Sequence, residues 1–174
     1  MLDLAHTQGR LWDAKPRVDD DGHVFSVRLA PATRQLTFTC AAFTSQGSGV
    51  LAGCCPSGSA SAAVLLLHLR ANRVSKLGHV PGTCTCVAAH PQRPGQSAAG
   101  SSTGAVAVFA TEGAGQQTDL LKVHRSGVQH LQFSGCGAYL VSASSDAVAI
   151  WDARVRAPAC WHRRRKDALL HVCL

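Results

Sequence analysis

The sequence has no long hydrophobic run. Its longest apolar stretches have six residues, as in Ala62 to Leu67, whereas a helix needs about 20 apolar residues to cross a bilayer. A membrane span is therefore excluded. The first residues, Met1 to His6, include the acid Asp3 and contain no apolar segment of the signal-peptide kind. We therefore expect a cytoplasmic chain without a secretory signal.

Charged and aromatic residues are also scarce, at 16% and 5% of the 174 residues. None of the aromatic residues alternates with basic residues along a strand, as a base-stacking platform for nucleic acid requires. The chain has 17 basic and 10 acidic residues, which gives a formal net charge of +7. Six of the 17 cations lie between Arg154 and Lys166, so the charge is uneven and does not indicate a broad nucleic-acid-binding surface.

Cysteine is plentiful, with eight residues, but its spacing is not that of a metal site. Cys54 and Cys55 are adjacent, and Cys84 and Cys86 are separated by one residue, whereas zinc ribbons use pairs separated by two or more. Without a secretory signal the thiols are expected to be reduced. We interpret them as small buried hydrophobic residues and predict no metal and no cofactor.

The most informative feature is a repeat. The clearest unit, His124 to Asp152, contains three short apolar strands separated by turn residues, which is typical of an all-β domain. The same order of apolar positions recurs twice upstream, and the corresponding residues Leu67, Phe109 and Trp151 follow one another at intervals of 42 residues. This period, with a terminal Trp-Asp pair, resembles the WD40 family, in which each repeat supplies a four-stranded propeller blade.

We predict an all-β fold, a WD40-type β-propeller fragment with about three four-stranded blades. Because propellers close with typically 4–8 blades, we expect an incomplete ring. In the second unit, Gly104 and Phe109 stand where the last unit has Asp146 and Trp151, so this blade is degenerate. The predicted parts are an N-terminal strand and linker (1–34), two degenerate blades (35–77 and 78–123), a clear blade (124–166) and the truncated start of a further blade (167–174).

Four residues of the last unit are candidates for a structural network, namely His124, Ser142, Asp146 and Trp151. We expect the indole to donate to the Ser hydroxyl, the hydroxyl to the imidazole and the imidazole to the carboxylate. Each of these groups would cost about 1–3 kcal/mol if buried without a partner. The alternative is a Ser/His/Asp hydrolase triad, but Ser142 lies in mid-strand and no G-x-S-x-G elbow is present. We therefore predict no catalytic residue.

The second candidate site is the basic cluster formed by Arg163, Arg164, Arg165 and Lys166. Such a cluster serves as a localisation signal or as a patch for an acidic partner. The plainer interpretation is a charged fourth strand and loop at the edge of the propeller, where cations discourage pairing with other chains. The sequence leaves both interpretations open.

Beyond the repeat, the order of several features is similar to the N-terminal propeller of the WD-repeat TBC-domain proteins, a Rab-GAP-like family of centriolar satellites. The TBC domain and coiled coil of that family are absent here, so no GTPase-activating residue can be transferred. The resemblance implies a scaffold at centrosomes and cilia, as part of a larger protein. It rests on Gly9-Arg10-Leu11-Trp12, Lys15-Pro16, Ala42-Phe43, Leu51-Ala52-Gly53, Asn72-Arg73, Ser144-Ser145-Asp146, Ile150-Trp151-Asp152 and the basic cluster.

The sequence therefore favours a non-enzymatic protein-interaction module that binds other proteins rather than a small-molecule substrate or a membrane. Its expected location is the cytoplasm, at the centrosome, centriolar satellites or the base of the cilium, as the resemblance implies. The alternative is a WD-repeat subunit of a nuclear RNA-processing or chromatin assembly, in which the basic stretch Arg154 to Lys166 would face nucleic acid.

Overall fold

The computed structural model describes a chain of strands and turns. The backbone is described for residues 9–10, 17–18, 24–26, 36–45, 47, 49–56, 58–69, 71, 73–110, 117–122, 124–153, 157–164 and 169–173, and the side chains from 36 to 153 apart from the gaps in this range and residues 117–118. Within this part of the chain, no helix has the length and apolar character that a membrane crossing requires.

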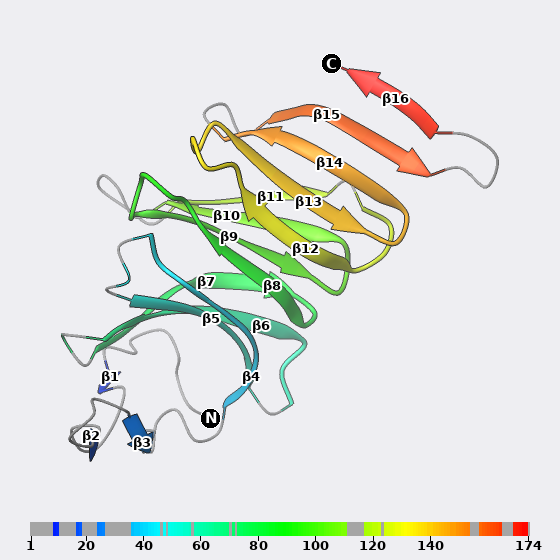
Figure 1. Ribbon diagram of the computed structural model, residues 1–174. Coiled ribbons are helices and arrows are strands. Elements are labelled where there is room, and N and C mark those ends of the chain that lie inside the picture. Colours follow the sequence, from blue (N-terminus) through cyan, green and yellow to red (C-terminus); the bar gives the residue numbers. More distant parts are fainter. Residues whose placement is uncertain are drawn as a thin grey trace.

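The strands form three antiparallel sheets that follow one another along the chain (Figure 1). In each sheet, four consecutive strands lie in chain order, so each sheet is a simple meander. The first contains β4 (Leu36–Phe43), β5 (Gly49–Pro56), β6 (Ser61–His68) and β7 (Arg73–Pro81); the second β8 (Cys84–Ala89), β9 (Gln96–Ser101), β10 (Ala105–Ala110) and β11 (Gln117–Lys122); the third β12 (Val128–Phe133), β13 (Tyr139–Ser144), β14 (Ala147–Asp152) and β15 (Ala157–Arg164).

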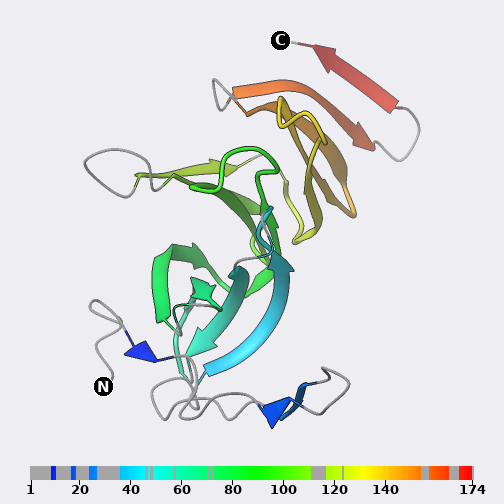
Figure 2. The same cartoon turned by 60° about the vertical axis from the view of Figure 1, so that its left-hand side comes forward.

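The three sheets are arranged as neighbouring blades of a propeller. Their first strands, β4, β8 and β12, lie side by side, with β8 between the other two. Figure 2 shows the first and third blades at opposite ends of the row, with the second between them. The ring is not closed. The predicted all-β class and the three four-stranded blades of an open ring are thus confirmed.

The first blade is longer than the repeat predicts. It extends to Pro81, beyond the predicted boundary at 77, and Gly78 and His79 lie inside β7 instead of opening the second unit. The cause is an insertion after Cys54. β5 and β6, on either side of the turn that follows it, have eight residues each, two more than β9 and β10 in the second blade. The added part of β6, from Ser61, pairs with the end of β7, so β7 is lengthened too.

The two chain ends each add a fifth, outermost strand. β1 (Gly9–Arg10) pairs with β7, and β16 (Leu169–Cys173) pairs with β15, both antiparallel. We expected 167–174 to begin a further blade; its described part instead extends the third sheet. The outer edges of β7 and β15 offer unpaired N–H and C=O groups that such strands satisfy. β2 (Arg17–Val18) and β3 (Val24–Ser26) form a separate small hairpin.

The largest buried side chains lie between the blades. Phe109 on β10 packs against the first blade in one apolar cluster, and Trp151 on β14 packs against the second blade in another. Both are almost fully buried, at 0% and 2% exposed. These two residues occupy the same position in successive blades, so the 42-residue period of the sequence is a period of inter-blade packing.

Candidate functional site

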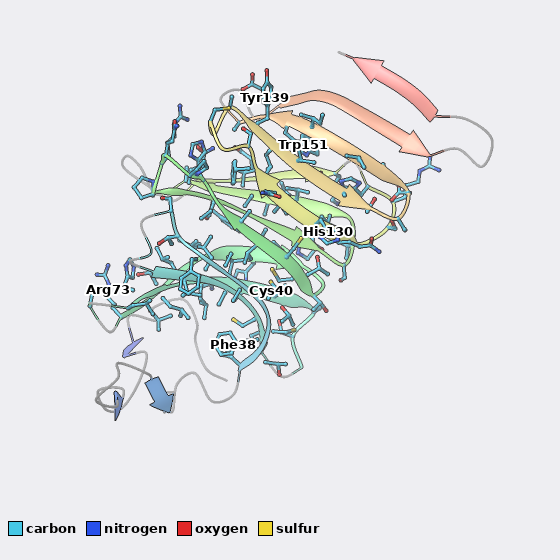
Figure 3. The ribbon with its side chains drawn as sticks, in the orientation of Figure 1. Phe38, Cys40, Arg73, His130, Tyr139 and Trp151 are labelled. Carbon is cyan, nitrogen blue, oxygen red and sulfur yellow. The ribbon has the colours of Figure 1, made fainter. Side chains whose placement is uncertain are left out.

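A chain of buried polar groups lies in the third blade. The indole Nε1 of Trp151 on β14 donates to Ser142 Oγ on β13 over 2.8 Å, and this hydroxyl lies 2.7 Å from His124 Nε2. Ser142 is fully buried, while His124 stands just before β12. The antiparallel register places Trp151, labelled in Figure 3, opposite Leu140. Because Ser142 lies two residues after Leu140, the side chains of Trp151 and Ser142 fall on one face of the sheet.

The link from the imidazole to Asp146 runs through Ser144, a residue that the sequence analysis did not place in the network. Ser144 Oγ lies 2.9 Å from His124 Nδ1 and donates to Asp146 Oδ1 over 2.7 Å. The expected direct donation from imidazole to carboxylate is therefore replaced by a relay. The turn between β13 and β14 has two residues, one fewer than the turn between β9 and β10 in the second blade, and the Ser144 hydroxyl bridges the imidazole and the carboxylate.

One assignment of protons satisfies every group in this chain. Trp151 donates to Ser142, and Ser142 donates to Nε2 of His124. The imidazole then carries its proton on Nδ1 and donates to Ser144, which donates to Asp146. Each hydroxyl has one proton and uses it once. His124 is neutral in this arrangement, in agreement with its pKa, which burial lowers below 6.5 although Asp146 acts in the opposite direction.

The carboxylate of Asp146 ties the turn between β13 and β14 to the loop before β12. It accepts the backbone N–H groups of Arg125 and Ser126, each at 3.2 Å, and the Ser126 hydroxyl. Burial alone would raise the pKa of Asp146, but the hydroxyl groups of Ser126 and Ser144 and the two backbone N–H groups outweigh it. Its pKa therefore lies well below its usual range, and the group stays ionised.

These two shifts predict that acid destabilises the third blade. A pKa lowered in the folded state means that the unfolded chain binds more protons, so stability rises with pH. For His124, the contribution is present above the unfolded pKa of 6.5 and is lost as the pH falls below it. We expect the melting temperature to fall between about pH 7.5 and about pH 5, and to fall less in a His124→Asn variant. Equal slopes for the two proteins would contradict the assignment of a neutral imidazole.

The second blade uses a shorter version of this arrangement. Ser101 pairs with the start of β8, as Ser144 pairs with the start of β12, so the two serines are equivalent. The hydroxyl of Thr103 lies 2.8 Å from Ser101 Oγ. Thr103 therefore occupies the position in the second blade that Asp146 occupies in the third. The sequence analysis matched Gly104 with Asp146, and the structure corrects this match. Gly104 is an additional turn residue with a φ of +83°.

A buried histidine that sequence reasoning missed joins the second and third blades. His90 Nε2 lies 2.9 Å from the Gly137 carbonyl oxygen, and its Nδ1 accepts the backbone N–H groups of Gln92 and Arg93. The ring is 2% exposed and lies 5.0 Å from the Phe133 ring, centroid to centroid. Because no repeat of His90 occurs at the matching positions of the other units, periodicity gave no signal for it.

A second inter-blade contact does repeat. Each first strand has a β-bulge. In the first two blades the residue at the bulge is a Thr that donates to a carbonyl of the next blade, Thr39 to Cys84 and Thr85 to Val128, each at 2.5 Å. The equivalent bulge in β12 holds Gln129. The Thr-Cys pairs at 39–40 and 85–86 were a visible sequence signal, and the sequence analysis did not use it.

Ser142 of the polar chain is not placed as an accessible nucleophile. The Ser142 hydroxyl has no exposed surface and is engaged on both sides, so it cannot reach the carbonyl carbon of a substrate. The sequence contains a G-x-G-x-x-A pattern from Gly47 to Ala52, a pattern that in a dinucleotide-binding fold opens a helix, but here Gly49 begins a strand. Among the residues whose side chains are described, no three His, Cys, Asp or Glu come together as metal ligands.

No family model matches the chain. It is similar to TBC1 domain family member 31 from Xenopus laevis, with 28% identity over 151 residues, which is 83% of this chain and 13% of that protein. The chain thus spans about one eighth of the length of this relative.

Two solved structures show the fold. A chain of the mitotic checkpoint complex superposes with a TM-score of 0.63 at 22% identity, over 91% of this chain and 46% of that one. U3-55K superposes with a TM-score of 0.57 at 14% identity, over 80% of this chain and 53% of that one. Both are WD40 propellers. The fold is an open WD40-type β-propeller. About half of each of these two chains is matched.

The basic cluster lies partly in the fourth strand of the third WD40-type blade. Arg163 pairs with Ala147 of β14, and Arg163 and Arg164 pair with Leu170 and Leu169 of β16. Arg165 and Lys166 lie outside the described residues. One of the two interpretations left open by the sequence was a charged fourth strand at the edge of the propeller. β15 is that fourth strand, but β16 pairs along it, so β15 is not the edge of its sheet.

Proposed function

We propose that this chain is a non-enzymatic interaction module, a WD40-type segment of a scaffold protein. The observation that carries the proposal is the contrast between equivalent residues in different blades. Phe133 in β12 is 6% exposed because the second blade covers it, whereas Phe43, at the same position of β4, is 71% exposed. The open face of the first blade therefore presents apolar side chains that a protein partner would cover.

The open face of the third blade has a different chemistry. His130 and Gln132 of β12, with Val141 and Ala143 of β13, line a hollow of about 380 Å³. Tyr139 and Val148 are 46% and 41% exposed. A partner that contacts this face meets hydrogen-bonding groups beside apolar ones. The two faces together favour further propeller blades or other proteins as partners over a small-molecule substrate.

In this proposal the polar chain makes the scaffold rigid. Its sequence-predicted members are His124, Ser142, Asp146 and Trp151. Their hydrogen bonds join the loop before β12, the second and third strands and the turn between these strands. A rigid blade holds its loops in place before a partner arrives, which lowers the ordering cost of binding. The same engagement of polar groups supports a role without catalysis.

The site of action in our proposal is the centrosome or the base of the cilium. Its support is the resemblance to the WD-repeat TBC-domain family and the similarity to TBC1 domain family member 31. Proximity labelling with the full-length protein that contains this segment tests it. We expect enrichment of centrosomal or basal-body proteins. Enrichment of spliceosomal or ribosomal proteins without centrosomal ones would instead favour the RNA-processing alternative.

For the basic cluster we propose contact with an acidic surface of a partner. A fourfold variant that neutralises Arg163, Arg164, Arg165 and Lys166 is expected to lose part of the labelled set, while a variant at Arg73 and Lys76, in the first blade, serves as the control. If the fourfold variant retains every partner, the basic cluster is a solvated charged segment and does not bind a partner. Binding to RNA that weakens steeply with added salt would identify phosphate as its ligand.

A further inference from the structure

Two thiols from neighbouring blades lie in contact. Cys40 on β4 and Cys84 on β8 have their sulfur atoms 3.5 Å apart, at hydrogen-bond distance (Figure 3 labels Cys40). Both are free cysteines. A disulfide has its sulfur atoms about 2.05 Å apart, so the pair is about 1.5 Å from covalent contact. The neighbouring bond from Thr39 to the Cys84 carbonyl holds the two strands together at this point.

The backbone of Gly53 on β5 leaves room for this pair. A side chain at position 53 would place its Cβ 2.5 Å from the Cys84 sulfur and 2.6 Å from the Cys40 sulfur. Both sulfur atoms therefore rest against a bare backbone. Cys84 is fully buried, whereas Cys40 is partly exposed. A small oxidant from solvent would meet Cys40 first.

The environment makes the two thiols chemically unequal. The hydrogen bond from Cys84 lowers the pKa of Cys40 to about 7, against the opposing effect of burial. The same bond, together with burial, raises the pKa of Cys84. A thiolate is the reactive form of cysteine, and at neutral pH Cys40 is the member of the pair that forms it. This division matches that of a peroxide-sensing thiol and its resolving thiol.

We propose that Cys40 is a modification site for hydroperoxides and that Cys84 resolves the product into a disulfide between the first and second blades. The Cys40 thiolate attacks one peroxide oxygen, the O–O bond breaks, and the leaving hydroxide takes a proton to become water. The Cys84 thiol then attacks the sulfenic sulfur of Cys40, the S–O bond breaks, and the leaving hydroxide takes the proton of Cys84 to become a second water. Two thiols are oxidised by two electrons, and one hydrogen peroxide is reduced to two waters.

The inference is independent of the scaffold role, because it rests on the two thiols alone. It is compatible with a reducing compartment, where disulfides are transient and serve as redox sensors. The bond would close a loop of 43 intervening residues and fix β4 against β8. A cross-link across a loop of this length restricts the unfolded chain, so the oxidised protein is expected to melt at a higher temperature than the reduced one.

The experiment treats the reduced chain with hydrogen peroxide, alkylates the remaining thiols and maps disulfides by mass spectrometry without reduction. Trypsin places Cys40 in peptide 35–70, together with Cys54 and Cys55, and places Cys84 and Cys86 in peptide 77–122. We expect these two peptides to be joined, with fragmentation assigning the bond to Cys40 and Cys84. A bond that uses Cys54 or Cys86, or no joined peptide at all, would overturn the proposal.

Two variants assign the roles. Cys84→Ser keeps a hydrogen-bond donor beside Cys40 but removes the resolving sulfur, and here we expect a sulfenic acid at Cys40 that a dimedone probe captures, with no disulfide. Cys40→Ser should lose both the joined peptide and the dimedone adduct. Cys136→Ser is the matched control, because Cys136 is exposed and lies in the third blade. It should behave like the unaltered chain; dimedone capture at Cys136 in place of Cys40 would contradict a selective site.

Discussion

Replacement of Trp151 by alanine is expected to lower the free energy of unfolding by about 3–5 kcal/mol, the range for deleting a large aromatic side chain from a core. The side chain is 2% exposed and packs in the cluster between the second and third blades. Its indole also supplies the donor at the start of the polar chain. Equilibrium unfolding in urea, followed by circular dichroism, measures the loss.

Two further variants separate packing from hydrogen bonding. Trp151→Phe keeps most of the apolar volume but removes the donor to Ser142. The lost hydrogen bond should lower the free energy of unfolding by about 1 kcal/mol. Phe109→Ala deletes the equivalent residue of the second blade, where no such donor exists. If Phe109→Ala and Trp151→Ala lower the free energy of unfolding equally, packing and not the hydrogen bond accounts for the effect of Trp151→Ala. An unchanged unfolding curve for Trp151→Ala would mean that the last unit is not a blade.

Gly104→Ala should be nearly as damaging, although it adds one methyl group to a turn. Gly104 has a φ of +83°, and a Cβ there would lie 2.3 Å from the His124 carbonyl oxygen and 2.8 Å from that of Ser126. A left-handed conformation costs about 1–2 kcal/mol for a residue with a side chain. Displacing the packed backbone adds about 1–3 kcal/mol. We therefore expect a total loss of about 2–5 kcal/mol, measured by the same denaturation.

The control for this substitution is Gly135→Ala in the turn after β12. No heavy atom lies within 4 Å of the Cβ that alanine would add there, and Gly135 is not among the glycines with a positive φ. Its stability should change by less than about 0.5 kcal/mol, as for other surface substitutions. Equal effects at positions 104 and 135 would show that the close approach of the two loops does not govern stability.

The blade count and the position of Trp151 were predictable because both follow from the 42-residue period. Inter-blade packing requires a large apolar side chain at one fixed position of each third strand, and a period records that requirement. The period did not give the boundary between the first and second blades correctly, because β7 continues to Pro81. The insertion after Cys54 lengthened three strands, and pairing between strands is not visible in a count of residues along the chain.

The details of the polar chain were less predictable, since they depend on turn geometry. The turn that holds Asp146 is one residue shorter than its counterpart in the second blade, and whether Ser144 can bridge His124 and Asp146 depends on backbone angles that residue spacing does not encode. His90 was missed for a related reason. Its partner is the carbonyl of Gly137, and any residue has a carbonyl, so no side-chain pattern marks the contact. The destination of Leu169–Cys173 depended on which strand edges are open in three dimensions.

The measurement that tests the account most directly is the molar mass of the isolated 174-residue chain, from size-exclusion chromatography with light scattering. Both end faces of the row of blades are open, and Phe43 on one of them is 71% exposed. We predict self-association that grows with protein concentration, and its suppression when a partner that supplies further blades is present. A compact, monodisperse monomer across the concentration range would contradict the open propeller.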